Sequence, residues 1–371
     1  MTFPVFELER WQSDWEHTVE YNLADSSVRG ASLADVMSEA QWAALRDLTL
    51  GYPQVNGTDA LRHLIAGLYR NAAPANVLVT VGGAEANQIA CQTLIEPGDH
   101  VFVTEPGYRQ VHGLATQAGA TVSALRLSAE RGWRADLDRL ERELDGRTKL
   151  IYVVNPNNPT GTILTREERS RIVQLAAKRG AWILADEVYA GSERDDRPET
   201  PSFWDAYERV VVVNSLSKAY GLPGLRIGWL VAPASLVGPL WRRHEYAVIA
   251  AAAPSMKLAE VALAEPVRST LLARQRRLSA EGWALLDHWL RAHPELATVE
   301  PSAATSIAFA RYRLPLDSVA VATAIREHAS VLVAPGAYLG AEGHLRITLG
   351  VGPDTVGPAL ERIARVLTSL G

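Results

Sequence analysis

The segment Ser-Leu-Ser-Lys-Ala-Tyr-Gly-Leu-Pro-Gly-Leu-Arg, residues 215–226, is the part of this sequence from which fold and chemistry are best predicted. It follows the apolar run Val210–Asn214, which predicts a buried β-strand. Two serine hydroxyls, a lysine and an arginine in a glycine-rich loop after a strand suit a ligand that bears a phosphate group. Lys218 alone among the four lysines of the chain has such surroundings. Lys149 and Lys178 are more simply interpreted as solvated charges, and Lys257, near the start of a predicted helix, has no companion motif.

That strand belongs to a longer alternation of apolar runs and helical stretches, from about residue 75 to 235. Seven β-branched or apolar runs predict strands at Asn76–Val81, His100–Thr104, Thr121–Leu125, Leu150–Val154, Trp182–Ala185, Val210–Asn214 and Ile227–Ala232. Predicted helices lie between several of them, at Glu85–Leu94, Tyr108–Ala118 and Arg166–Arg179. Such alternation favours an α/β fold with a mostly parallel sheet covered by helices on both faces.

Chain length and a change of sequence pattern after about residue 255 indicate a second, smaller domain. A single hydrophobic core stops growing near ~250–300 residues, and this chain has 371. We expect a large domain at residues 45–255 and a small α/β domain formed by residues 1–44 and 256–371. Within the small domain, Ser255–Leu290 is a long, arginine-rich amphipathic stretch. The first ~40 residues read as helix plus loop and are expected to pack on the C-terminal part.

Composition excludes several classes of protein. The formal net charge of −5 argues against a general nucleic-acid binder. No run of ~18 uncharged apolar residues could span a membrane, and the start Met1–Val5 does not resemble a signal peptide. Cys91 is the single cysteine, so an internal disulfide or a cysteine metal cluster is impossible. We therefore expect a cytoplasmic protein with no metal site and no nucleic-acid or membrane partner.

Asp186 is a candidate partner for a pyridine cofactor. It stands at the C-terminal end of a predicted strand, in Asp-Glu-Val-Tyr at residues 186–189, and such strand ends form the usual ligand edge of an α/β sheet. A pyridine cofactor withdraws electrons only while its ring nitrogen stays protonated, which calls for a buried carboxylate beside that nitrogen. An acidic residue at a strand end can also be a plain helix cap.

Two further loops precede predicted helices or follow predicted strands. Asn-Pro-Asn-Asn-Pro-Thr-Gly, residues 155–161, could aim the Asn158 amide at a ligand oxygen or be a simple turn. Gly82-Gly83-Ala84 opens a predicted helix, whose free N–H groups make a phosphate cradle. Ser215 and Lys218 also match the Ser-x-x-Lys of penicillin-binding enzymes, but the Ser-Asp-Asn and Lys-Thr-Gly strings of those enzymes are missing downstream.

The sequence resembles the class I/II aminotransferases of fold type I. The resemblance rests on three motifs in order, at residues 155–161, 186–189 and 215–218, and on Arg226, eight residues beyond Lys218. The spacing agrees as well, because Asn158 and Asp186 are 28 residues apart. The resemblance spans roughly residues 50 to 350. It implies a seven-stranded, mostly parallel sheet sandwiched by helices, and pyridoxal 5'-phosphate (PLP) as cofactor. It also implies transamination of an α-amino acid to a 2-oxo acid, in amino acid metabolism.

The resemblance further implies roles for individual residues. Lys218 carries the cofactor as a Schiff base and moves the proton, and Asp186 pairs with the pyridine nitrogen. Other cofactor contacts are implied for Asn158 and Tyr189 at the ring hydroxyl, Tyr108 on the ring face, and Ser215, Ser217, Arg226, Gly83 and Ala84 at the phosphate. Arg346, with Asn158, matches the residues that bind the substrate. Tyr52 matches a tyrosine that reaches the phosphate of the neighbouring subunit, which implies a homodimer.

Some features depart from the common family pattern. The N-terminal segment Tyr21–Gly30 lacks the usual Gly-x-Pro-x string, and residues 301–305 lack the common Gly-Gly turn. Leu8–Trp11, Asp25–Ser27, residues 334–336 and residues 345–347 look like a subgroup near capreomycidine synthase. Enzymes of that subgroup cyclise a hydroxylated arginine. The resemblance therefore leaves open transamination, or cyclisation, elimination or oxidation of an arginine-like amino acid.

A non-enzymatic alternative is the aminotransferase-like effector domain of a transcription regulator. Such proteins carry an added helix-turn-helix region, whereas the roughly 50 residues before the cofactor domain here are rich in tryptophan and acidic groups. The preferred substrate side chain depends on which polar residues line the pocket. The candidates are Glu16, Asp25, Ser26, Arg29 and Arg109.

Overall fold

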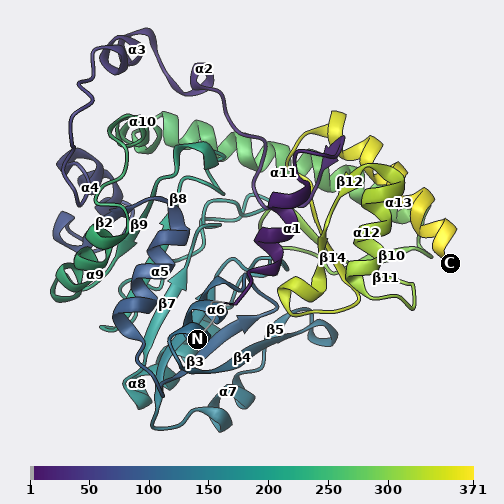
Figure 1. The fold of residues 1–371 in the computed structure, drawn as a ribbon, viewed down its shortest axis with the longest axis horizontal. Coiled ribbons are helices and arrows are strands. Elements are labelled where there is room, and N and C mark those ends of the chain that lie inside the picture. Colours follow the sequence, from purple (N-terminus) through teal and green to yellow (C-terminus); the bar gives the residue numbers. More distant parts are fainter. Residues whose placement is uncertain (1–3) are drawn as a thin grey trace.

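The computed structural model describes residues 4–371, and a large twisted sheet forms the left part of the molecule in Figure 1. Met1–Phe3, part of the start Met1–Val5 that does not resemble a signal peptide, lie outside the described residues. The sheet has the strand order β2-β9-β8-β7-β6-β3-β4-β5. Its strands are β2 (Val77–Thr80), β3 (His100–Glu105), β4 (Thr121–Ser128), β5 (Arg134–Ala135), β6 (Thr148–Val154), β7 (Trp182–Asp186), β8 (Val210–Ser215) and β9 (Gly228–Val231).

Seven of these strands overlap the seven predicted runs. The sheet has an eighth strand, so the expected number of seven strands was wrong. Neighbouring strands pair in parallel, except that β9 is antiparallel to β2 and β8, and β5 is antiparallel to β4. The strand that was missed, β5, is two residues long at the sheet edge. Two residues are too few to show a periodicity of two, so the sequence pattern could not reveal it.

Alternating side chains of the strands feed two separate hydrophobic layers. In β8, Val211 and Val213 belong to the layer on one face, whereas Val210 and Val212 belong to the layer on the other. Helices α5 (Gly82–Leu94), α6 (Gln110–Gln117) and α9 (Ala234–Ala247) contribute to the first layer. Helices α4 (Asp59–Ala66), α8 (Arg166–Arg179) and α10 (Ala253–Leu263) contribute to the second. The predicted helix–sheet–helix sandwich is therefore confirmed.

The ends of α8 illustrate how local sequence sets an element. Thr165 accepts a hydrogen bond from the Glu168 backbone N–H, and Glu168 caps the Thr165 N–H in return. Gly180 ends the helix in the left-handed conformation, with φ of +66°. These two signals explain why the predicted and observed bounds of α8 agree.

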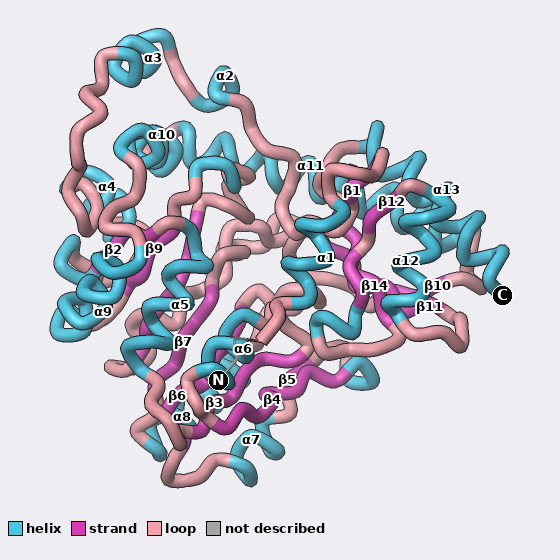
Figure 2. Tube along the Cα trace, viewed as in Figure 1, coloured by secondary structure: helices cyan, strands magenta, loops and turns pink. Residues whose placement is uncertain are grey.

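A smaller part, on the right in Figure 2, contains a four-stranded antiparallel sheet in the order β10-β11-β14-β13. Its strands are β10 (Ala297–Val299), β11 (Ile307–Tyr312), β13 (Ala334–Pro335) and β14 (His344–Thr348). A separate parallel pair joins β1 (Tyr21–Asn22) to β12 (Val331–Leu332). Helices α12 (Ser318–Ala329) and α13 (Pro353–Leu370) pack against each other and against these strands.

The N-terminal segment reaches both parts of the molecule. Helix α1 (Glu7–Trp15) contacts β13, and β1 pairs with β12, as expected for a segment that packs on the C-terminal part. Helices α2 (Leu33–Val36) and α3 (Glu39–Arg46) then arch across the top of the view, and α3 contacts α10 (Figure 1). The division into residues 45–255 on one side, and 1–44 with 256–371 on the other, stays a prediction.

The amphipathic stretch Ser255–Leu290 forms two helices rather than one. Helix α10 ends at Leu263, and α11 (Val267–Ala292) begins directly after Pro266. Proline has no backbone N–H to continue the first helix, so the break falls before it. The remaining helices are α7 (Leu137–Glu143) and short 3-10 turns at Pro74–Asn76, Ala129–Arg131, Pro223–Leu225 and Gly336–Leu339.

Neither a membrane-spanning helix nor a cluster of metal-binding side chains occurs within residues 4–371. None of the helices there combines the length and hydropathy needed to cross a membrane. The described side chains include no group of three or more histidine, cysteine, aspartate or glutamate residues able to hold a metal ion.

Candidate active site

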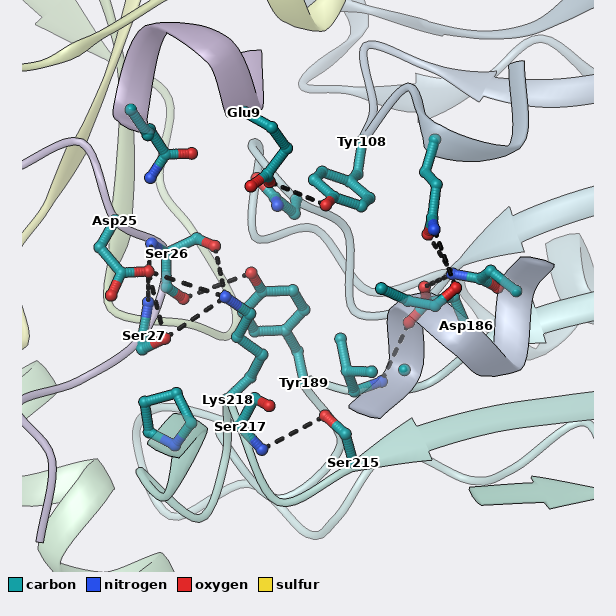
Figure 3. A pocket seen from close by; sticks show the side chains of 18 of the residues that line it. Glu9, Asp25, Ser26, Ser27, Tyr108, Asp186, Tyr189, Ser215, Ser217 and Lys218 are labelled. Carbon is teal, nitrogen blue, oxygen red and sulfur yellow. Dashed lines mark hydrogen bonds and ion pairs between the residues drawn. The ribbon is translucent and has the colours of Figure 1, made fainter. Parts of the chain in front are cut away.

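A cavity of about 300 Å³ opens where the carboxyl ends of β6, β7 and β8 face β14 and α1. Parallel strands present their carboxyl ends at one edge of a sheet, which brings their following loops together. Eleven of the twelve residues predicted for the site line this cavity, namely Gly83, Ala84, Tyr108, Asn158, Asp186, Tyr189, Ser215, Ser217, Lys218, Arg226 and Arg346. Figure 3 shows several of their side chains converging from different elements. Tyr52 is the exception, because it lies outside the cavity with 88% of its surface exposed.

One end of the cavity is a cradle made by the first turn of α5. The free N–H groups of that turn face a space that Ser215, Ser217 and Arg226 also line. Gly82 has a φ of +78°, and a Cβ on it would stand 2.5 Å from Arg226 Nη2. The glycine therefore lets a guanidinium approach the helix N-terminus closely. Backbone donors, hydroxyls and a cation in this arrangement suit a phosphate dianion.

Asp186 lies buried at the carboxyl end of β7. Its Oδ2 accepts hydrogen bonds from Tyr152 Oη at 2.9 Å and Asn87 Nδ2 at 3.1 Å. Burial raises the pKa of Asp186, although these two donors and the nearby Lys218 oppose the rise. A cation placed beside Asp186 would compensate the cost of keeping the carboxylate charged there.

Sequence reasoning did not find Asn87 and Tyr152. The signal for both was a polar side chain on an otherwise apolar surface. Asn87 follows Gly83 by one helical turn in α5, and Tyr152 lies within a continuous apolar run in β6. Both are buried, so each side chain needs a polar partner, and Asp186 provides it.

Lys218 is held by a turn of the N-terminal segment. Its Nζ donates to Ser26 Oγ at 2.9 Å and to Ser27 Oγ at 3.3 Å, and Asp25 Oδ1 lies 3.7 Å away (Figure 3). Desolvation opposes charge on Asp25, but the Lys218 ammonium, the Arg346 guanidinium and two backbone N–H groups outweigh it and lower the pKa of Asp25. Ser27 was absent from the sequence prediction for the pocket.

Arg346 enters the cavity from β14 with 1% of its surface exposed. Its Nη1 donates to Asn158 Oδ1 at 3.2 Å, and its Nη2 donates to the Ala24 carbonyl at 2.5 Å. The buried Nε has no hydrogen-bond partner among the described residues. Burial lowers the pKa of Arg346, yet a guanidinium stays charged in proteins. Because Arg346 lines the cavity, an anionic ligand bound there can accept a hydrogen bond from this Nε.

Tyr189 and Tyr108 stand on different sides of this space. Tyr189 Oη donates to the Ser26 carbonyl at 3.3 Å, and burial raises the pKa of Tyr189. Tyr108 Oη donates to Glu9 Oε1 of α1 at 2.8 Å. The two tyrosines thus connect the loops of the large sheet to the N-terminal segment.

Three of the five specificity candidates line the cavity, and two do not. Glu16, Asp25 and Ser26 are in its wall. Arg29 pairs instead with Asp354 at 2.7 Å, away from the site. Arg109 pairs with Glu105 at 3.4 Å and also lies outside the cavity lining. Neither arginine is therefore available to a ligand in this cavity.

Comparison with known proteins assigns this fold and site to a family. Residues 19–363 match the model of aminotransferase class I and II, so the chain belongs to that family of PLP-dependent enzymes. A PLP-dependent aminotransferase of Streptococcus suis has a solved structure that is 30% identical, with a TM-score of 0.93 over 100% of this chain and 99% of that one. The expected family, fold and cofactor are confirmed, and transamination in general is supported.

Two relatives differ in their named activities. Capreomycidine synthase of Streptomyces vinaceus is 30% identical over 99% of this chain and 94% of its own length. Aspartate/prephenate aminotransferase of Thermus thermophilus is 28% identical over 90% of this chain and 88% of its own length. Similarity at this level leaves the substrate of the present chain to be inferred from its pocket.

The residues of the cavity fit PLP. The cradle at α5 suits the phosphate, and Asp186, whose charge is disfavoured by burial, suits a protonated ring nitrogen. Lys218 lies in the same cavity and is a quarter exposed, so its amine is accessible. These three features occupy one continuous space, as a single cofactor requires.

Proposed function

We propose that the protein transaminates an α-amino acid to a 2-oxo acid, with Lys218 as the lysine that carries PLP. The observation that supports this most is one cavity lined by Lys218, the carboxylate of Asp186 and the guanidinium of Arg346, whose buried Nε has no partner among the described residues. An amine anchor, a partner for a ring nitrogen and an anchor for a substrate carboxylate are the groups that the reaction needs.

Cofactor binding divides among several elements. Ser215, Ser217 and Arg226 bind the phosphate with the backbone N–H groups of Gly83 and Ala84. Asn158 and Tyr189 hydrogen-bond the ring hydroxyl, and Tyr108 packs on the ring face. When bound, PLP supplies an electron-withdrawing ring that stabilises negative charge at the substrate α-carbon.

Substrate binding and proton transfer fall to the remaining residues. Arg346, held by Asn158, orients the α-carboxylate through its planar fork. The Lys218 amine, once it is free, takes the substrate α-proton as a general base. It then returns a proton to the bound substrate and cofactor. Ser26 and Ser27 keep the amine within reach, because their hydroxyls hold Nζ at 2.9 and 3.3 Å.

We further propose that the working unit is a cytoplasmic homodimer. Tyr52 is 88% exposed in the single chain and outside the cavity, which suits a residue that completes the phosphate site of a partner subunit. The single cysteine, Cys91, is buried and unpaired, which suits a reducing compartment.

The test of the assigned lysine is Lys218→Ala, with Lys178→Ala as the control. Lys218→Ala should abolish turnover and the visible absorbance of the lysine-bound cofactor, because the anchor and the base are removed together. Lys178 is 64% exposed on α8, so Lys178→Ala should behave as the unmodified enzyme. Transamination that survives in Lys218→Ala would refute the assignment.

A second candidate keeps PLP and Lys218 but changes the outcome, to cyclisation, elimination or oxidation of an arginine-like amino acid. Two observations favour it. The turn Asp25–Ser27 accepts hydrogen bonds from Lys218 Nζ, and the chain is 30% identical to capreomycidine synthase. Product analysis separates the two. A 2-oxo acid formed in proportion to an added amino acceptor supports transamination, and an amino acid product formed without an acceptor supports the second candidate.

A further inference from the structure

The mouth of the cavity is bordered by one face of helix α1. Glu9, Gln12, Ser13 and Glu16 all line the cavity, and they follow the spacing i, i+3, i+4, i+7 of a single helical stripe. The opposite face is anchored in the core by Leu8 and by Trp11, whose Nε1 donates to the Val333 carbonyl at 3.0 Å. The polar stripe is therefore fixed toward the cavity.

The stripe and the adjoining turn place three carboxylates at this end of the cavity: Glu9, Glu16 and Asp25. Glu9 uses Oε1 to accept the Tyr108 hydroxyl, and Asp25 uses Oδ1 to accept the Ser26 and Ser27 N–H groups. Among the described residues, no hydrogen bond occupies the second oxygen of either group. Glu16 pairs at 3.4 Å with His17, which is 87% exposed.

Positive charge in the cavity is committed elsewhere. Among the described residues, three cationic side chains line the cavity. The proposed function uses Lys218 for the cofactor, Arg226 for its phosphate and Arg346 for the substrate α-carboxylate. No further lysine or arginine of residues 4–371 lines this space for a negatively charged substrate side chain.

Arg346 also fixes where the substrate side chain must go. Its buried Nε lacks a partner, and its Nη2 donates to the carbonyl of Ala24, the residue directly before Asp25. A ligand whose carboxylate is bound by Arg346 therefore begins next to Asp25. The residues Glu9 and Glu16 line the same cavity, so they are in reach of a side chain that extends from this point toward α1.

We propose that the substrate is an amino acid whose side chain ends in a cation, an ammonium or a guanidinium, bound by Asp25 with Glu9 and Glu16. This assignment rests on the proposed function, because it takes Arg346 as the carboxylate anchor. A cation meets carboxylate oxygens that are free to accept from it. These carboxylates repel an anionic side chain, and no uncommitted cation lines the cavity to pair with it. The pocket thus disfavours aspartate, glutamate and their 2-oxo acids, the reverse of what the name of the Thermus thermophilus relative suggests.

The test compares amino acids of matched shape on the PLP-loaded enzyme. L-lysine is set against L-norleucine, which lacks the terminal ammonium, and L-arginine against L-citrulline, in which a neutral urea replaces the guanidinium. L-glutamate is the anionic probe. Spectroscopic titration gives each dissociation constant, and rapid mixing gives the rate at which the cofactor absorbance changes. The cationic member of at least one pair should bind roughly 10-fold or more tightly than its neutral partner.

Variants of the acidic group connect that preference to particular carboxylates. Asp25→Asn should reduce the cation-to-neutral ratio by roughly tenfold. Glu9→Gln and Glu16→Gln should reduce it by less, because Asp25 alone of the three directly follows Ala24, the residue that Arg346 contacts. Asp14→Asn, on the same helix but outside the cavity lining, should leave the ratio unchanged. A ratio is used because Asp25 also contacts Lys218, which affects all substrates alike.

Each outcome separates the two proposals. Neutral amino acids that bind and react as well as cationic ones, or an unchanged ratio in Asp25→Asn, would overturn the substrate assignment and leave the proposed function standing. If none of the five amino acids changes the cofactor spectrum, the substrate assignment fails, whereas the proposed function is tested separately by the loss of turnover and of cofactor absorbance in Lys218→Ala.

Discussion

At the scale of single residues, the sequence identified most groups that meet in the cavity but not the groups that hold them. Lys218 and Asp186 stand in ordered motifs with fixed spacing, and both line the cavity. Asn87 and Tyr152, which donate to Asp186, carry no motif of their own. Their importance depends on which buried carboxylate happens to be nearest, and a single sequence does not contain that information.

Glu187 provides a prediction at this scale. It is buried beside Asp186, its Oε1 accepts the Phe203 N–H at 2.7 Å, and burial raises the pKa of Glu187 from 4.5 to about 7. The folded state therefore holds this proton more tightly than the unfolded chain. The stabilisation is complete below pH 4.5 and is lost as pH rises through 7.

Glu187→Gln should remove that pH dependence. The difference in unfolding free energy between pH 4.5 and 8 should shrink by up to ~3 kcal/mol relative to the unmodified protein. Chemical denaturation at a series of pH values measures it. Glu208→Gln, at an exposed position, is the matched control and should leave the profile as it was. A profile that Glu187→Gln does not alter would contradict the burial argument.

At the scale of elements, strand ends and helix starts position the site. The long strands and α8 were predicted well, whereas α5 begins at Gly82 instead of Glu85 and α6 at Gln110 instead of Tyr108. The long strands and α8 are marked by periodicity and caps, and the Gly-Gly turn marks the start of α5. Short elements escaped prediction, as β5 did, and so did the break between α10 and α11. Glu9 and Glu16 are seven residues apart, a helical spacing, but nothing in the local sequence shows that they face the cavity.

The close approach of α5 to Arg226 gives a prediction at this scale. Gly82→Ala should weaken PLP binding by about tenfold or more, because the left-handed backbone is strained for alanine and its Cβ meets Arg226 Nη2 at 2.5 Å. Titration of the cofactor-free protein with PLP measures this. Gly146→Ala is the control, since its Cβ would have no atom within 4 Å. Equal affinity in the two variants would argue against the cradle.

At the scale of the whole molecule, the cavity combines segments that lie far apart in the chain. Arg346 bonds to Asn158 across 188 residues and to Ala24 across 322. The family resemblance implied the first of these encounters, but periodicity and composition could not, because they describe neighbours in sequence. The contact of the Asp25–Ser27 turn with Lys218 became evident only from the folded chain.

The proposed homodimer makes a prediction for the assembled molecule. Light scattering should give twice the chain mass. Tyr52→Phe should weaken PLP binding several-fold in that dimer, because one hydroxyl contact to the phosphate is lost. Tyr246→Phe is a control of equal chemistry at a residue that is 93% exposed. A monomeric mass, or a Tyr52→Phe dimer that binds PLP as tightly as the unmodified enzyme, would contradict the role of Tyr52.

The central claim, that Lys218 carries the cofactor, has a direct chemical test. Borohydride reduction of the PLP-loaded enzyme fixes the cofactor on its lysine, and peptide mass spectrometry then locates the added phosphopyridoxyl group. The chain offers four lysines, Lys149, Lys178, Lys218 and Lys257, on well-separated peptides. We predict the label on Lys218. A label on any of the other three, with Lys218 unmodified, would contradict the account.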